Sequence, residues 1–191
     1  MSRVDLESSI QSYLRSTLSP KRLIHSLNTA ELCKNLAARF GLEPQKGHWI
    51  GLLHDAAREL PPEELLQRTQ SLGIRPDPQE QENPILLHGI ISAEIARSRF
   101  GIEERELLEA IRHHTLGKPG LHPYGKVLYV ADYIEPSRTF VDDTFRSRIL
   151  ALSLDEMLLE ILEEEKRFRK NLASITQEMY DELKGRRVER A

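Results

Sequence analysis

Residues 49–57 read WIGLLHDAA, which places His54 and Asp55 side by side within an otherwise apolar segment. A run of this kind predicts a largely buried helix, which we expect to cover about Gln45 to Leu60. A desolvated carboxylate is costly unless it is paired or bound to a metal ion. Because adjacent helix positions diverge by about 100°, both side chains can reach one cavity. The pair is therefore the first candidate for a metal or catalytic site.

Local start and stop signals divide the rest of the chain into further helices. Ser19-Pro20 and Asn83-Pro84 each supply an N-cap residue followed by a proline at the first helical position. Gly41 and Gly101 each precede an apolar residue at the end of a helical pattern, which predicts a left-handed C-terminal cap. No segment alternates with a period of two, so we predict an all-α fold. Helices are expected at about residues 6–18, 20–40, 45–60, 63–72, 84–100, 103–115 and 125–134, with a loop at 74–83.

The chain from Phe145 onward combines many charges with an apolar stripe at helical spacing. The pairs Glu163 with Arg167 and Glu165 with Arg169 are four residues apart, so we expect a solvated face with ion pairs. The stripe could pack within the chain or support a homodimer. We divide the chain into an N-terminal helix (1–18), a central helical domain (19–150) and a C-terminal helical extension (151–191) on the same domain. The stripe consists of Leu154, Met157, Leu158, Ile161, Phe168 and Leu172.

The composition narrows the range of functions. Among 191 residues, 27 are Lys or Arg and 30 are Asp or Glu, so the formal net charge is −3. This near balance argues against a general nucleic-acid coat, and we expect no nucleic-acid partner. No apolar run approaches the roughly 18–20 residues that span a bilayer, and the first residues lack the pattern of a signal peptide. Cys33 is the single cysteine and cannot form an internal disulfide, so we expect a cytoplasmic protein without a membrane partner.

Further polar side chains are predicted to point into the helical core. His25 lies on the apolar face of its helix, and His88 lies within the apolar run ILLHGII at 85–91. Asp132 interrupts a second apolar segment at 130–134. In the dipeptide His113-His114, His114 continues the apolar stripe of its helix, whereas His113 falls on a more polar side. We therefore expect His114 to point inward and His113 to lie at the rim or surface.

Imidazoles and carboxylates that meet in a core indicate one of two arrangements. A single buried histidine is usually a core side chain satisfied by hydrogen bonds. Five segments that each aim such a group inward favour a metal site instead, because neutral imidazole and carboxylate suit Fe, Mn, Zn, Co or Ni. His48 and His122 lie near helix starts or loops, and we expect both at the surface.

The order of these residues along the chain carries a family resemblance. His25, the pair His54-Asp55, His88, His114 and Asp132 resemble the pattern of the HD-domain metallophosphohydrolases, which have an all-α helical bundle. The strings GLLHD (51–55), LLHG (86–89), HTLG (114–117) and ADYIEPSR (131–138) are similar to the YqeK-type symmetrical diadenosine tetraphosphate hydrolases of bacteria. The chain departs from that branch at Leu116, where many relatives carry a threonine, and at His113, where an aromatic residue is usual.

The resemblance implies a pair of transition-metal ions, typically iron, although manganese and cobalt share the same ligand preference. The expected reaction splits diadenosine tetraphosphate, a dinucleoside polyphosphate, into two ADP molecules. Bound metal lowers the pKa of water toward neutrality and so supplies the attacking hydroxide. We assign catalysis to His54, Asp55 and Arg58, with Asp55 between the two ions. The implied metal ligands are His25, His54, Asp55, His88, His114 and Asp132.

A polyanionic substrate needs cationic and polar groups around the metal site. Arg58 lies three residues after Asp55, and further cations flank the segments of His114 and Asp132. Each of these cations could also be an ordinary solvated side chain. The candidate substrate-binding residues are Asn28, Arg58, Thr115, Lys118, Lys126, Glu135 and Arg138. Asn28 could instead orient a metal ligand, Thr115 could cap its helix, and Glu135 could pair with a cation or hold a ligand from behind.

Two other functions remain open from the sequence. One is an HD-domain phosphohydrolase or phosphodiesterase that acts on a different nucleotide. The other is a non-catalytic helical module that binds a nucleotide, or a partner through the charged C-terminal helix.

Overall fold

The computed structural model describes residues 3–76, 78–168 and 171–189. These residues form eleven α-helices and one short 3₁₀ helix without any strand, which confirms the predicted all-α fold. None of the helices in the described part is long and apolar enough to cross a bilayer. The helices are α1 (Arg3–Thr17), α2 (Pro20–Arg39), α3 (Pro44–Leu53), α4 (Pro62–Ser71), α5 (Pro78–Glu82), the 3₁₀ helix (Pro84–Leu87), α6 (His88–Phe100), α7 (Arg105–Arg112), α8 (Pro123–Ile134), α9 (Asp143–Leu150), α10 (Leu154–Phe168) and α11 (Ser174–Glu189).

The local capping signals act as the sequence predicts. Ser19 caps α2, because its hydroxyl accepts a hydrogen bond from the backbone amide of Arg22 (3.4 Å). Gly41 and Gly101 adopt left-handed φ angles of 73° and 66°. The amide that follows each glycine donates to a carbonyl in the last turn of the helix, at 2.8 and 3.1 Å. These caps set the ends of α2 and α6, two of the helices that carry site residues.

The helix expected over residues 45–60 is shorter than predicted and ends at Leu53. The amide of His54 still donates to the carbonyl of Ile50 (3.0 Å), as in an α-helix. Beyond it the spacing tightens, and the amide of Arg58 donates to the carbonyl of Asp55 (2.9 Å). The His54-Asp55 pair therefore lies where α3 gives way to a series of turns, rather than within a continuous helix.

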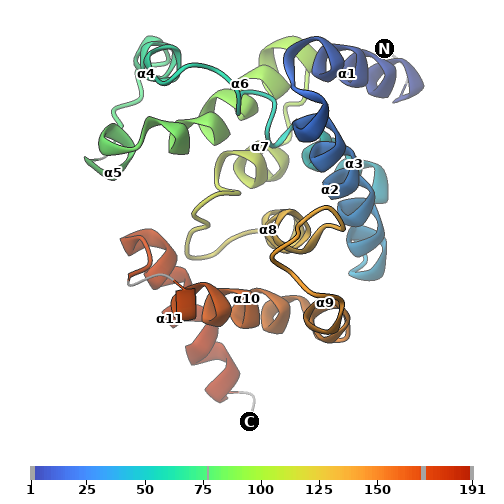
Figure 1. The fold of residues 1–191 in the computed structure, drawn as a ribbon, viewed down its shortest axis with the longest axis vertical. Helices are drawn as coiled ribbons and strands as arrows, with labels where there is room; N and C mark the ends of the chain where they lie inside the picture. Colours follow the sequence, from blue (N-terminus) through green and yellow to red (C-terminus); the bar gives the residue numbers. More distant parts are fainter. Residues whose placement is uncertain (1–2, 77, 169–170, 190–191) are drawn as a thin grey trace.

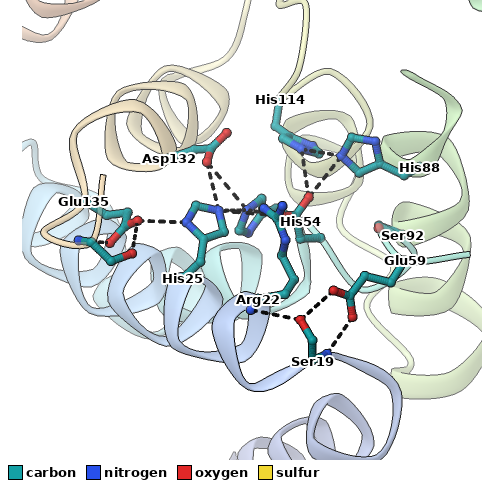
Figure 2. Close-up of polar contacts among 12 residues, drawn as sticks. Ser19, Arg22, His25, His54, Glu59, His88, Ser92, His114, Asp132 and Glu135 are labelled. Atoms are coloured by element: carbon teal, nitrogen blue, oxygen red, sulfur yellow. Dashed lines mark hydrogen bonds and ion pairs between the residues drawn. The ribbon is translucent and has the colours of Figure 1, made fainter. Parts of the chain in front are cut away.

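Two tertiary contacts hold these turns between neighbouring helices. Glu59 accepts hydrogen bonds from the amide (2.5 Å) and hydroxyl (2.6 Å) of Ser19, at the start of α2 (Figure 2). The amide of Ala57 donates to the hydroxyl of Ser92 in α6 (3.0 Å). The position of the His54-Asp55 pair is thus fixed relative to α2 and α6.

Four further predictions for the N-terminal two thirds of the chain need correction. The expected loop at 74–83 contains the short helix α5, and the side chain of Asn83 makes no capping hydrogen bond. The segment after Asn83 starts with a 3₁₀ turn before α6 begins. His48 is buried rather than exposed, because α1 covers it and places Glu7 Oε1 3.3 Å from its Nε2 atom. His122 is exposed, as predicted.

The charged C-terminal region also differs from the expectation. Arg167 pairs with Glu164 (2.9 Å) rather than with Glu163, and Arg169 lies outside the described residues. Glu165 is buried and accepts a hydrogen bond from the hydroxyl of Tyr129 (2.8 Å), so it does not belong to a solvated face. The apolar stripe is buried through Met157, Leu158 and Ile161, but Phe168 at its end is 79% exposed.

The helices pack around α8, which lies near the centre of the molecule with α10 and α11 below it and α2 and α3 beside it (Figure 1). The two ends of the chain lie at opposite ends of the long axis. Two glycines allow close helix contacts: a Cβ atom at Gly51 would lie 2.4 Å from Ala30 Cα, and one at Gly89 would lie 2.7 Å from the carbonyl oxygen of Arg112. These contacts bring α2 against α3 and α6 against α7.

Candidate metal centre

Four histidine side chains from four different segments converge on one buried point (Figure 2). His25 comes from α2, His54 from the end of α3, His88 from the start of α6 and His114 from the turn after α7. Each is at most 4% exposed. The Nε2 atoms of His25 and His54 lie 3.1 Å apart, and those of His88 and His114 lie 3.0 Å apart. The site therefore contains two histidine pairs, and the rings of His54 and His114 meet edge to face between them, with centroids 5.0 Å apart.

The Nδ1 atoms of the four rings all point away from this centre, each toward a hydrogen-bond acceptor. A carbonyl or carboxylate oxygen can only accept, so each Nδ1 carries a proton. In a neutral ring, Nε2 is then left with a lone pair that is directed into the centre. The acceptors are the carbonyl oxygens of Gly51 (2.7 Å), Ile85 and Ile111 (2.7 Å) for His54, His88 and His114, and Glu135 Oε1 (2.9 Å) for His25.

The carboxylate of Asp55 lies between the two histidine pairs. Its Oδ1 atom is 3.0 Å from His88 Nε2 and 3.7 Å from His114 Nε2. Its Oδ2 atom is 3.5 Å from the Nε2 atoms of both His25 and His54. Burial opposes ionisation of Asp55, but the surrounding imidazoles, led by His54, hold its pKa well below the usual range. Each oxygen of one carboxylate thus faces a different pair of imidazoles.

Asp132 of α8 lies next to the His25–His54 pair, on its solvent-facing side. Its Oδ1 atom is 3.0 Å from His25 Nε2 and 3.8 Å from His54 Nε2, while its side chain is 21% exposed. The site side chains at His25, His54, His88, His114, Asp55 and Asp132 are therefore brought together as the sequence predicted. The orientation of His114 rather than His113 toward the cluster is also confirmed.

Glu135 and Asn28 were predicted to contact the substrate, but they lie behind the histidine cluster and not in the cavity. Glu135 is fully buried, and its Oε2 atom accepts hydrogen bonds from Asn28 Nδ2 (3.0 Å) and the amide of Ser137 (2.6 Å). Burial opposes its ionisation, but hydrogen bonds from His25 and Ser137 lower its pKa to about 2. Neither residue lines the cavity described below. Glu135 contacts the His25 ring and Asn28 contacts Glu135, so both lie behind the site, where a carboxylate can orient a histidine ring.

A cavity of about 730 Å³ opens directly over the cluster and is lined by Asp55, His88, His114 and Asp132. Thr115 and the predicted cations Arg58 and Arg138 also line it. Arg138 contacts the Oδ1 atom of Asp132, and its Nε atom donates to the carbonyl of the same residue (2.9 Å). The floor of the cavity is therefore a cluster of imidazoles and carboxylates, and guanidinium groups stand at its sides.

A third guanidinium group, which the sequence pattern did not predict, also lines this cavity. Arg22 lines the wall, and its Nη1 atom is 2.7 Å from Asp55 Oδ2. It lies three residues before His25 on α2, so helical periodicity places the two side chains on one face. That spacing from His25 could have identified Arg22.

Lys118 and Lys126 do not line the cavity, in contrast to the expectation. Lys118 pairs with Glu109 (3.2 Å), and Lys126 pairs with Asp155 of α10. On α8 a separation of six residues turns Lys126 by about 120° away from the face of Asp132, which explains its different partner. Proximity in sequence to a ligand was a poor guide for both lysines.

The outer part of the cavity is aromatic, a feature that no sequence pattern predicted. The aromatic residues that line it are Tyr129 and Tyr133 of α8, Phe140 and Phe145 from the α8–α9 region, and Phe168 at the end of α10. No short motif marks these residues, because they come together only when α8, α9 and α10 pack.

Comparison with known proteins agrees with this geometry. Residues 22–137 match the model of the HD domain. The chain belongs to the HD-domain family. A relative from Bacillus subtilis, named "Bis(5'-nucleosyl)-tetraphosphatase, symmetrical", is 32% identical over 77% of this chain and 78% of its own length. A protein of the same name from Staphylococcus aureus is 33% identical over 77% of this chain and 76% of its own length.

A solved HD-domain structure has the same overall fold. The crystal structure of a predicted HD superfamily hydrolase involved in NAD metabolism, from Clostridium acetobutylicum, superposes with a TM-score of 0.88. It is 30% identical to this chain, and the match covers 94% of this chain and 97% of the other. The likeness extends over nearly the whole chain, including the helices that follow the HD-domain match.

The donor set in this HD-domain protein fits a metal ion. Three groups of side chains place one ligand atom each within 4.8 Å of one another. Nitrogen of neutral imidazole and oxygen of carboxylate are the donors that suit mid-row transition metals. When the rings are neutral, the lone pairs on their Nε2 atoms point inward, which is the orientation that such an ion needs. The groups are His25–His54–Asp55, His54–His114–Asp132 and Asp55–His88–His114.

Proposed function

We propose that this protein hydrolyses dinucleoside tetraphosphates symmetrically, converting diadenosine tetraphosphate into two ADP molecules. The observation that carries the proposal is the position of Asp55, whose two oxygens face two histidine pairs at the floor of a cavity lined by arginines. This arrangement suits a polyphosphate. The relatives named as symmetrical tetraphosphatases support this choice of reaction among HD-domain hydrolases.

The six predicted ligands would hold two metal ions, which we take to be iron, with manganese or cobalt as chemical equivalents. His25, His54 and Asp132 would hold one ion, and His88 and His114 the other. Asp55 would bridge them, since each of its oxygens faces one histidine pair. When bound, such ions lower the pKa of water toward neutrality and offset charge on phosphoryl oxygens.

The other residues of the site would bind and orient the substrate. The guanidinium groups of Arg22, Arg58 and Arg138 lie around the cluster and would contact the phosphate chain, because guanidinium groups pair well with phosphate oxygens. Thr115 supplies a hydroxyl in the same wall. In this arrangement His54 and Asp55 would contribute to catalysis by holding metal. Arg58 would contribute by stabilising negative charge on the phosphate.

Product analysis tests this proposal. The protein is loaded anaerobically with Fe²⁺ or with Mn²⁺ and given diadenosine tetraphosphate, diadenosine triphosphate, ATP and a cyclic nucleotide in parallel. Chromatography should show two ADP per diadenosine tetraphosphate, and the Asp55→Ala variant should bind little metal and release no product. Formation of AMP and ATP, or preferred hydrolysis of a cyclic nucleotide, would refute the symmetrical reaction.

A further inference from the structure

Two phenylalanine rings in the cavity are unusually exposed. The large hydrophobic side chains that are exposed within the described residues are Ile24, Leu72, Phe140, Phe168 and Val188. Only Phe140 (63% exposed) and Phe168 (79% exposed) of this set line the cavity over the histidine cluster. They come from separate segments, one between α8 and α9 and the other at the end of α10. An exposed aromatic surface inside a cavity is typical of a site that binds an apolar or aromatic group.

Phe140 is supported by its neighbours. Its ring packs against Tyr133 in an edge-to-face contact, with ring centroids 5.4 Å apart. The centroid of the Tyr133 ring in turn lies 6.4 Å from that of Phe145. The rings of Phe140, Tyr133 and Phe145 therefore form a continuous aromatic wall. This wall holds Phe140 at the cavity although most of its ring is open to solvent.

Arg138 connects the aromatic wall to the histidine cluster. Its guanidinium carbon lies 5.8 Å from the centroid of Phe140, and the same guanidinium group contacts the carboxylate of Asp132. A ligand whose phosphates contact Arg138 would therefore place its next group against the ring of Phe140. In a nucleotide, that group is the nucleoside.

Positive and negative side chains lie at different ends of the cavity. The arginines lie with the histidine cluster, whereas the carboxylates of Asp142, Glu164 and Glu165 accompany the aromatic residues. Asp142 is two residues after Phe140, and Glu164 and Glu165 shortly precede Phe168. Asp142 caps α9, Glu164 pairs with Arg167 and Glu165 accepts from Tyr129, and their negative charge disfavours a phosphate chain at this end of the cavity. The aromatic end therefore suits the uncharged part of a nucleotide.

From these contacts we propose that Phe140 and Phe168 form the binding site for a nucleotide base of the substrate. The inference rests on the proposed function, because it takes the ligand to be a nucleotide whose phosphates occupy the arginine end. The base would stack on the exposed rings. Stacking uses the π-face that every base has, so this site would favour nucleotides over inorganic polyphosphates without selecting strongly between adenine and guanine.

Equilibrium binding of ADP and of pyrophosphate to the Mn²⁺-loaded protein tests the base site. Truncation of a ring that stacks on a base weakens binding by about 5- to 150-fold. We expect Phe140→Ala and Phe168→Ala to weaken ADP binding within this range and to leave pyrophosphate binding unchanged. Phe140→Trp should retain the affinity for ADP. Val188→Ala removes an equally exposed side chain outside the cavity and should change neither affinity.

The outcomes separate this inference from the proposed function. Unchanged ADP binding in both alanine variants, or an equal loss of ADP and pyrophosphate binding, would overturn the base site. Because ADP binding is measured without turnover, this holds even if the wild-type protein fails to split diadenosine tetraphosphate, which would refute the proposed function alone. If the wild type does split it, the alanine variants should raise KM for diadenosine tetraphosphate more than they lower kcat.

Discussion

The Nε2 atoms of His88 and His114 lie 3.0 Å apart, although both rings donate through Nδ1 to backbone carbonyls. Two neutral rings in this geometry would direct two lone pairs at each other. Burial lowers the pKa of both, but contacts with Asp55 raise the pKa of His114 above its ordinary value while that of His88 stays below it. A proton shared between the rings relieves the repulsion, and a metal ion can do the same. The cluster is therefore built to hold positive charge.

Metal uptake should release protons, and more of them at low pH. The pKa of His25 is also raised: burial lowers it, but hydrogen bonds to Asp132 and Glu135 more than offset that effect. A group with a raised pKa carries its proton to higher pH, whereas a metal ion requires the deprotonated ring. Calorimetric titration with Mn²⁺ in buffers of different ionisation enthalpy should show more protons released at pH 6.5 than at pH 8.5, with weaker binding at pH 6.5. Equal affinity and no proton release at both pH values would be inconsistent with metal binding by these rings.

The neighbouring histidines provide a matched pair of substitutions. His114→Ala removes a ligand from the cluster and should lower metal content to about half or less, with loss of hydrolysis. His113 is half-buried outside the cluster, and its pKa is lowered to about 4 by burial and by the nearby Lys118 and Arg112. His113→Ala should therefore keep the metal content of the wild type in elemental analysis. An equal loss of metal in the two variants would show that His114 is not a metal ligand.

Glu135→Gln should weaken metal binding without removing a ligand. The buried carboxylate accepts from His25 Nδ1, and loss of such a partner typically costs about 10- to 100-fold in metal affinity. A glutamine can present its NH₂ group to His25 and favour the wrong tautomer. Competition with a chelator measures the affinity, and Glu109→Gln, which alters a carboxylate away from the site, is the control. An unchanged metal affinity in Glu135→Gln would show that the orientation of His25 does not depend on Glu135.

Gly51→Ala should destabilise the fold by about 3 kcal/mol through overpacking. The added Cβ would lie 2.4 Å from Ala30 Cα and 2.8 Å from Ala30 N, and backbone atoms cannot move aside as a flexible side chain can. Gly185→Ala in α11 meets nothing within 4 Å and should be neutral or stabilising by up to about 1 kcal/mol. Urea unfolding of both variants measures the difference. A Gly51→Ala protein as stable as the wild type would mean that α2 and α3 are not in such close contact.

The features that the sequence predicted well are those with a local cause. Ser19 and Gly101 determine helix ends through hydrogen bonds within a few residues, so their roles can be recognised without the fold. The orientation of His114 follows from the periodicity of a single helix. The identity of the six clustered residues followed from a family pattern that is spread over the chain.

The features that the sequence did not predict depend on packing between distant segments. The early end of α3 is stabilised by the contacts of Glu59 with Ser19 and of Ala57 with Ser92, which no local pattern reveals. Lys126 is paired by Asp155 from α10, a helix that comes much later in the chain. The aromatic wall likewise exists only when α8, α9 and α10 are assembled.

The most direct test of the metal centre is anomalous diffraction from crystals of the protein loaded with Fe²⁺ or Mn²⁺. Data collected above and below the absorption edge of the metal locate its ions independently of the protein coordinates. We predict two anomalous peaks, one beside each oxygen of the Asp55 carboxylate, within coordination distance of the His25–His54 and His88–His114 pairs. Fully loaded crystals without a peak between these side chains, or with ions bound only elsewhere on the protein, would contradict the account.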